Sequence, residues 1–277
     1  MKTSIPIRLL ALLLWATCGL LSAQERTDTL RTDDPTRRIT RATLYGAGTA
    51  NVFDTYLSPQ AYTGIDFRIS HESVRMTRIG GGGKVWRQIF FQTDLGYTHN
   101  KADNNNTLSM LANWNYGLHR RFPITHNFRL LAGGVADLNG GFVYNMRNGN
   151  NPAQARAYAN LDASGGFLWD LRLARRPLQL RYQLNVPLLG VMFMPEYGQS
   201  YYEIFSLGHA GGVVNFTSLH NQPSLRQIIS ADYPVGPLKM RLAYIWDAQQ
   251  AHVNGIKAHT YSHVFMVGFV KELYLIK

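Results

Sequence analysis

The chain has 277 residues, with 28 Lys and Arg against 17 Asp and Glu, a formal net charge of +11, and a single cysteine. One cysteine excludes an intrachain disulfide framework. A basic excess is common in nucleic-acid-binding proteins, but these basic residues are dispersed along alternating segments, so we expect no nucleic-acid partner.

Residues 1–23 have the pattern of a secretory signal peptide. A basic start and a short apolar core, residues 9–14, precede small residues just before position 24. The apolar run is too short for a membrane-spanning helix. A lipoprotein anchored at Cys18 fits less well, because the bulky Trp15 lies shortly before it. We therefore expect export and cleavage, which lowers the net charge by the two basic residues Lys2 and Arg8.

Residues 24–38 are polar and rich in Thr, Asp and Arg, without an apolar period. This composition predicts a flexible periplasmic leader. The folded domain is expected over residues 39–277.

Alternating apolar and polar residues dominate the rest of the chain. In residues 107–120 every second side chain from Leu108 to Leu118 is apolar and the intervening ones are mostly polar, as in a strand with two unlike faces. With their aromatic residues, such strands suit a β-barrel between lipid and water, although a soluble β-sandwich shows the same alternation. The candidate strands are residues 41–53, 62–71, 84–98, 107–120, 127–139, 155–173, 178–188, 208–217, 224–233, 238–248 and 259–275.

The connections indicate how many strands the barrel has. Short proline-marked links at 121–126, 175–177 and 234–237 resemble periplasmic turns, and longer links at 101–106, 140–154 and 249–258 resemble external loops. Eleven strands cannot keep these two kinds of link on opposite sides. The fold prediction is all-β, a single antiparallel transmembrane β-barrel. We predict twelve strands, with a descending strand within 191–207; the alternative is ten, with 189–219 as one external excursion.

Polar side chains on the strands are expected to face the lumen. Arginine and lysine rings there favour anions, so we predict a porin-like passive channel for small solutes, with anions favoured. The alternative is a structural or binding barrel with a filled lumen, where Asp66 pairs with Arg68, or Asp162 and Asp170 pair with Arg172. The predicted lining residues are Arg68, Asp94, Asn113, Asn115, Arg129, Arg181, Lys239 and Arg241.

The segment 194–205 interrupts the strand rhythm with aromatic, hydroxyl and carboxylate side chains. Long loops in barrels often carry binding functions, so it is a candidate constriction loop. The alternative is an aromatic belt with a tight turn. We expect Glu203 or Tyr202 to point into the barrel or its mouth. The candidate constriction residues are Glu196, Tyr197, Tyr201, Tyr202 and Glu203.

Catalytic and metal-binding patterns are weak. His259 and His263 lie four residues apart on one strand, about 13 Å, too far to share a metal ion, so we predict no metal and no cofactor. With nine histidines a Ser–His pair is easily proposed, and no catalytic residue is assigned. A lipid-modifying enzyme, which needs such a pair at the lipid-facing rim, is the third function considered.

Two stretches resemble an uncharacterised family of Gram-negative outer-membrane β-barrels, a domain of unknown function. They are Thr-Asp-Asp-Pro-Thr-Arg-Arg-Ile-Thr-Arg at 32–41 and Pro-Glu-Tyr-Gly-Gln-Ser-Tyr-Tyr-Glu-Ile-Phe at 195–205. The resemblance implies a barrel in the outer membrane, and implies no substrate or catalytic residue. Expected partners are outer-membrane lipid and lipopolysaccharide, with a small solute for a channel; the sequence does not indicate an oligomeric state.

Overall fold

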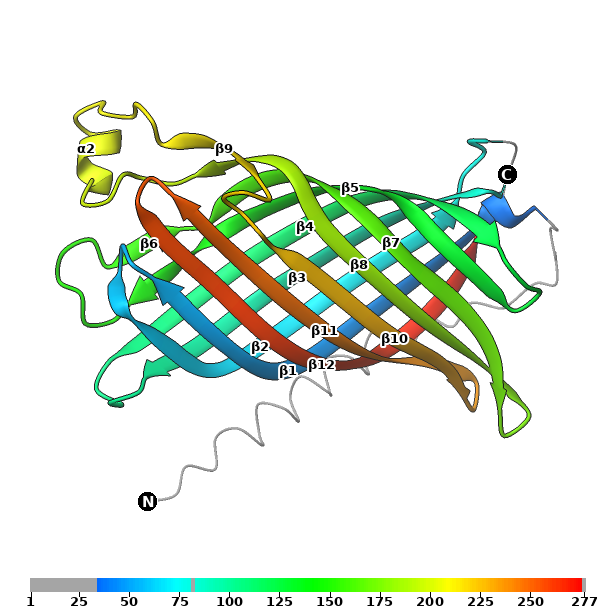
Figure 1. The fold of residues 1–277 in the computed structure, drawn as a ribbon. Coiled ribbons are helices and arrows are strands. Elements are labelled where there is room, and N and C mark those ends of the chain that lie inside the picture. The colour runs from blue at the N-terminus through cyan, green and yellow to red at the C-terminus, as the bar shows by residue number, and fades with distance from the viewer. Residues whose placement is uncertain (1–33, 81–82, 276–277) are drawn as a thin grey trace, which may run out of the picture. The chain divides into compact units, whose positions relative to one another are not determined.

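The computed structural model describes residues 34–80 and 83–275, so the predicted signal peptide and most of the predicted leader lie outside the described residues. Strands make up most of the described chain (Figure 1). The elements are η1 (Pro35–Arg37), β1 (Arg38–Asp54), β2 (Ser58–Met76), β3 (Val85–Asn100), β4 (Asn106–Pro123), β5 (Phe128–Asn145), β6 (Ala153–Ala155), β7 (Ala157–Leu173), β8 (Arg176–Phe193), α2 (Tyr201–Phe205), β9 (Val214–Ser218), β10 (Leu225–Val235), β11 (Leu238–Val253) and β12 (Ile256–Tyr274). No helix in this part of the chain is long and apolar enough to cross a membrane.

The strands form one antiparallel sheet that closes into a barrel. The sheet has twelve strands in all. The ring itself runs β1-β2-β3-β4-β5-β7-β8-β10-β11-β12 and back to β1, and it closes where β10 pairs with β8. The short strands β6 and β9 pair only with β5 and β8, so they extend the wall at one end without entering the ring. The predicted antiparallel barrel with a sheet of twelve strands is confirmed, although β6 and β9 lie outside the ring, which holds ten strands.

The two ends of the barrel differ as predicted. We call the end that holds Arg38 and Tyr274 the terminal end; it carries the turns after β2, β4, β7 and β10, including the three predicted short links. The opposite end, the loop end, carries the remaining connections, among them the excursion from β8 to β10 that contains α2 and β9 (Figure 1). Because the ring has an even number of strands, it begins at Arg38 and ends at Tyr274 on the same side. A ring of eleven strands could not do this.

Three details of the predicted connections are wrong. The proposed descending strand in 191–207 is the end of β8 followed by a loop and helix α2. The predicted loop 249–258 is a tight hairpin, because Asn254 and Gly255 both have positive φ, as a two-residue hairpin turn requires. The predicted loop 140–154 shortens, because β5 continues to Asn145.

The barrel is apolar outside and polar inside. Along β2, Asp66, Arg68, Ser70 and Glu72 are buried, whereas Ile65, Phe67 and Ile69 are 45% to 53% exposed. The same alternation runs through the other long strands. An apolar outer surface facing lipid and a polar interior are what a transmembrane β-barrel requires.

Position 48 of β1 leaves no room for a side chain against β12. A Cβ on Gly48 would lie 1.8 Å from the carbonyl oxygen of His263 and 2.7 Å from the Cα of Val264, both backbone atoms that cannot move aside cheaply. We expect Gly48→Val to lower the free energy of unfolding by about 1–3 kcal/mol. The neighbouring Ala47 is exposed, so Ala47→Val is the matched control. Urea unfolding of the refolded barrel in detergent measures both, and equal midpoints would contradict the packing argument.

Candidate functional site

The inner wall of the barrel carries two ionic layers separated by an apolar one. The outer ionic layer, toward the loop end, is formed by Asp66, Arg68, Asp94, Arg226 and Asp247 with their amide partners. The inner ionic layer, toward the terminal end, is formed by Glu72, Arg181, Asp232 and Arg241.

Arg68 is the centre of the outer ionic layer. Its guanidinium lies 2.8 Å from Asp66 and 2.6 Å from Asp94, and it also pairs with Asp247. It donates a further hydrogen bond of 2.8 Å to the hydroxyl of Ser262. The side chain is 2% exposed, so three carboxylates surround one fully enclosed cation.

Arg226 extends the outer ionic layer across the lumen. Its Nε lies 2.5 Å from Asp247 on β11, and its Nη1 donates to Asn113 Oδ1 at 2.6 Å and Asn115 Oδ1 at 3.1 Å on β4. The two asparagines in turn donate to Asp137 on β5, at 2.5 and 2.6 Å. A continuous set of polar contacts therefore joins β2 and β11 to β4 and β5.

The inner ionic layer also crosses the lumen. Glu72 on β2 accepts a 2.7 Å hydrogen bond from Arg181 on β8 and a second one from Arg241 on β11. In the ring, β3, β4, β5 and β7 lie between β2 and β8 on one side, and β1, β12, β11 and β10 on the other. The Glu72–Arg181 pair therefore joins opposite walls. Arg241 also forms a two-point contact with Asp232, at 2.5 and 2.8 Å.

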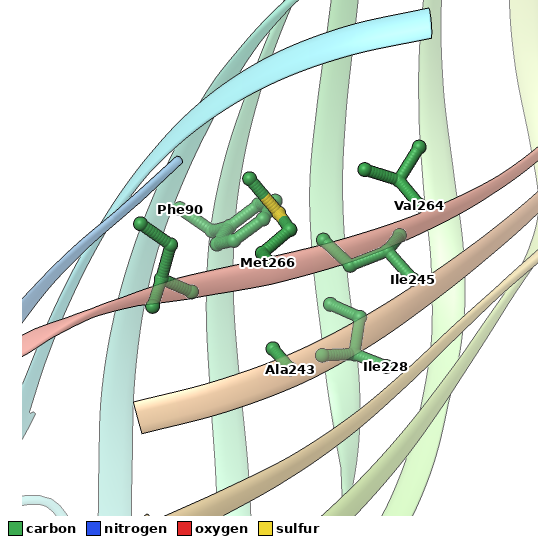
Figure 2. Close-up of a cluster of buried hydrophobic side chains, with 7 residues drawn as sticks. Phe90, Ile228, Ala243, Ile245, Val264 and Met266 are labelled. Carbon is green, nitrogen blue, oxygen red and sulfur yellow. The ribbon is translucent and has the colours of Figure 1, made fainter. Parts of the chain in front are cut away.

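Apolar side chains occupy the space between the two ionic layers. Figure 2 shows this cluster, to which β10, β11 and β12 contribute most of the side chains. On β10 the order from the loop end is Arg226, Ile228 and Asp232, so the apolar residue lies between one member of each ionic layer. The cluster consists of Leu44, Phe90, Ile228, Ala243, Ile245, Val264 and Met266.

A further set of contacts covers the mouth at the loop end. Arg156, which precedes β7, lies 2.9 Å from Asp54 at the end of β1, and these strands are on opposite sides of the ring. The Tyr201 hydroxyl donates to Gln154 at 2.8 Å and accepts from the Ala155 amide at 2.7 Å. The Tyr56 hydroxyl donates to the Gln199 carbonyl at 2.9 Å, and burial raises the pKa of Tyr56 to about 12.

The excursion between β8 and β10 is held by its own helix cap and by neighbouring turns. Ser200 and Glu203 form a capping box at the start of α2. The amide and hydroxyl of Ser200 donate to the Glu203 carboxylate and lower its pKa. The Asn254 side chain, from the β11–β12 turn, donates to the Met194 carbonyl at 2.8 Å. The excursion is thus attached to the rim at several points.

The structure places six of the eight predicted lining residues inside the lumen: Arg68, Asp94, Asn113, Asn115, Arg181 and Arg241 are all buried. The other two lie near the terminal end, where Arg129 pairs with Asp170, and Lys239 lies 3.4 Å from Glu272. The predicted Asp66–Arg68 pair is present. The predicted pairing of Asp170 with Arg172 is replaced by the pairing with Arg129.

In the candidate constriction loop, the tyrosine that reaches the mouth is Tyr201. Tyr202 and Tyr197 are 65% and 69% exposed, and Glu196 is also exposed. Glu203 caps its own helix and pairs with no lumen arginine. The expectation that Glu203 or Tyr202 points inward is therefore wrong, because the capping interaction satisfies the carboxylate locally.

Several members of the ionic layers were not among the predicted lining residues. They include Glu72 of the inner ionic layer, and Arg226 and Asp247 of the outer ionic layer. Each lies at an inward position of a strand that alternates. The alternation could have identified two of them from the sequence. Arg226 lies two residues from the inward-facing Ile228 on β10, and Asp247 lies two residues from the inward-facing Ile245 on β11.

Between the mouth and the outer ionic layer lies a small cavity of about 50 Å³. Arg68, Asp94 and Arg226 contribute to its lining on one side, and Arg156 and Met194 on the other. About 10–15 Å³ of volume measured in this way is enough to hold one water molecule, so the cavity has room for a few water molecules.

In the described part of the chain, two Ser–His pairs lie within hydrogen-bond distance. His119 Nε2 lies 2.8 Å from the Ser164 hydroxyl, but both residues are buried inside the lumen. Ser218 and His220 lie 2.6 Å apart on the exposed rim. His220 also lines a surface groove of about 350 Å³ with His252, Lys257 and other residues. Among residues 34–80 and 83–275 no group of three or more His, Cys, Asp or Glu side chains could hold a metal ion.

Solved structures with a similar fold are outer-membrane proteins of low sequence identity. The transport unit of the autotransporter AIDA-I from Escherichia coli is 10% identical, with 95% of this chain and 97% of that chain covered and a TM-score of 0.47. The outer-membrane protease OmpT from Escherichia coli is 11% identical, with 89% and 100% covered and a TM-score of 0.47. A Pseudomonas aeruginosa FadL homologue is 11% identical, with 88% and 71% covered and a TM-score of 0.36.

No curated protein matches the chain. A family model described as "protein of unknown function (DUF3316)" matches residues 6–277, nearly the whole sequence. The chain therefore belongs to the DUF3316 family.

Proposed function

We propose that the protein is a Gram-negative outer-membrane β-barrel whose lumen is closed by its own side chains, and that it acts as a structural or binding barrel. The observation that carries this proposal is the pair of ionic layers that join opposite walls. Arg226 reaches from β10 to β4, and Arg181 reaches from β8 to Glu72 on β2.

The membrane location is supported by the apolar outer surface and by the sequence of residues 1–23. Large apolar side chains remain exposed on the outside of many strands, including Leu242 at 61% and Phe265 at 70%. Exposed apolar surface of this extent marks contact with lipid or a partner. An export signal followed by an even-stranded barrel fits the outer membrane.

A passive channel is the competing proposal, and the lumen contents favour the closed barrel over it. The arginines that would select anions in an open pore are bound to carboxylates, and the apolar cluster lies between the two ionic layers. Opening a solute path would separate buried ion pairs, which leaves charges uncompensated and is strongly unfavourable.

Swelling of liposomes that contain the purified, heat-modifiable barrel tests the closed lumen. We expect no swelling in isotonic solutions of small sugars or small organic anions, alongside rapid swelling with a general porin as the positive control. Solute-dependent swelling by the wild-type barrel would reject the closed lumen and restore the channel.

A second candidate, a lipid hydrolase, is favoured by one observation, the exposed Ser218–His220 pair beside the rim groove. In this reading Ser218 is the nucleophile and His220 the base. We expect any esterase activity on micellar lipid to be lost in Ser218→Ala. Because Ser218 lies at an exposed rim, its removal leaves folding unchanged, and activity retained in Ser218→Ala would reject this candidate.

A further inference from the structure

The outer surface near the terminal end carries a group of basic side chains on five neighbouring strands. They occupy outward-facing positions on β12, β1, β2, β3 and β4, as the alternation of these strands shows. We call this group the basic belt: Lys271, Arg41, Arg75, Arg87 and Arg120.

The strand register places like charges of the basic belt directly opposite each other. Arg41 pairs across the sheet with Lys271, and Arg75 pairs with Arg87. Like charges at directly opposite positions of an antiparallel pair are destabilising. Among the ion pairs of residues 34–80 and 83–275, none involves a member of the basic belt. An external anion would remove the repulsion.

The basic belt lies at the border of the apolar surface. On the outer surface, the next outward-facing residue toward the loop end is Phe269 above Lys271 on β12 and Leu118 above Arg120 on β4. Phe269 is an exposed apolar side chain. The belt is therefore at the level where the hydrocarbon of a bilayer gives way to headgroups, and basic side chains at this level attract anionic lipid.

The five members of the belt lie on one side of the barrel, and on the other side Arg176, an outward arginine at the start of β8, donates to the Pro234 carbonyl. Near the same end, the outward positions of β5, β7 and β11 carry Leu130, Trp169 and Leu238, each 40% to 41% exposed. A general polar border would continue around the ring. A one-sided cluster instead marks a face that binds a ligand.

We propose that the basic belt binds the phosphate headgroups of anionic phospholipid in the periplasmic leaflet of the outer membrane. The proposal rests on the proposed membrane location, with the terminal end facing the periplasm. Phosphate suits the belt because it accepts hydrogen bonds from guanidinium groups two at a time. One phosphodiester between Arg75 and Arg87 would neutralise their cross-strand repulsion.

Lipid selectivity measured with spin-labelled lipids tests this proposal. The barrel is reconstituted in phosphatidylcholine, and the association of spin-labelled phosphatidylglycerol is compared with that of spin-labelled phosphatidylcholine. We expect a preference of about fivefold for phosphatidylglycerol at low salt, and a smaller one at high salt because the charges are screened. The belt variant Arg41→Gln, Arg75→Gln, Arg87→Gln, Arg120→Gln, Lys271→Gln should show no preference.

The matched control removes the same number of positive charges elsewhere. It carries substitutions at turns and strand ends around the two ends of the barrel, away from the belt, and should keep the preference: Lys101→Gln, Arg147→Gln, Arg172→Gln, Arg175→Gln and Lys257→Gln. Equal loss in both variants, or no preference in the wild type, would overturn the proposal. If lipid A displaced phosphatidylglycerol better than cardiolipin does, the belt would be assigned to the other leaflet. That result would also overturn the proposal. Heat-modifiable migration of every variant separates these outcomes from failure of the barrel itself.

Discussion

Arg68→Ala is expected to lower the free energy of unfolding by about 3–5 kcal/mol, because removing one partner of a buried ion pair leaves uncompensated buried charge. The effect is large here because three carboxylates, those of Asp66, Asp94 and Asp247, lose the same cation. Urea unfolding in detergent or lipid, followed by tryptophan fluorescence, gives the difference. A change below about 1 kcal/mol, the range of exposed ion pairs, would show that water reaches this layer.

Two further variants separate charge from general damage. Arg175→Ala removes an exposed arginine at a turn, and it should change the free energy of unfolding little. Adding Asp94→Asn to Arg68→Ala should restore part of the loss, because the carboxylate of Asp94, whose ion pair is with Arg68, is then no longer left buried without its cation. Failure of the second substitution to restore any stability would indicate that the guanidinium acts mainly by packing.

The faces of the strands could be predicted from the sequence because the side-chain period in a strand is two. In residues 107–120 the predicted apolar face is the outer one, where Met110 and Trp114 are exposed, and the polar face holds the buried Asn113 and Asn115. Strand ends were less predictable. The polar residues of 249–258 suggested a loop, yet Ala251, Val253, Ile256 and Ala258 continue the inward pattern through the hairpin.

The connections across the lumen could not be predicted, because they depend on ring closure. Arg226 meets Asn113, 113 residues away in sequence, only because β10 pairs with β8 and so completes the ring. The strand count had to be correct before any such pair could be proposed. Helix α2 was different: its signal, Ser200 followed three residues later by Glu203, is present in the sequence. The expectation of an inward Glu203 overlooked it.

Removing both ionic layers together is expected to convert the closed barrel into a conducting one. The variant replaces the four basic and five acidic residues of the two ionic layers by Ser, and adds Phe90→Ala to thin the apolar cluster. The nine residues replaced by Ser are Asp66, Arg68, Asp94, Arg226 and Asp247 of the outer ionic layer and Glu72, Arg181, Asp232 and Arg241 of the inner ionic layer.

Planar-bilayer recordings should show no steady conductance for the wild type and stable single-channel steps for the full variant. Variants that lack only one ionic layer should stay closed, because the other layer still joins opposite walls through Arg181 and Glu72 or through Arg226 and Asn113. Deleting residues 196–201 opens only the mouth, so this variant should also stay non-conducting, with both ionic layers beneath it intact. Conductance produced by the deletion alone would place the barrier at the mouth, because the two ionic layers would then already admit ions.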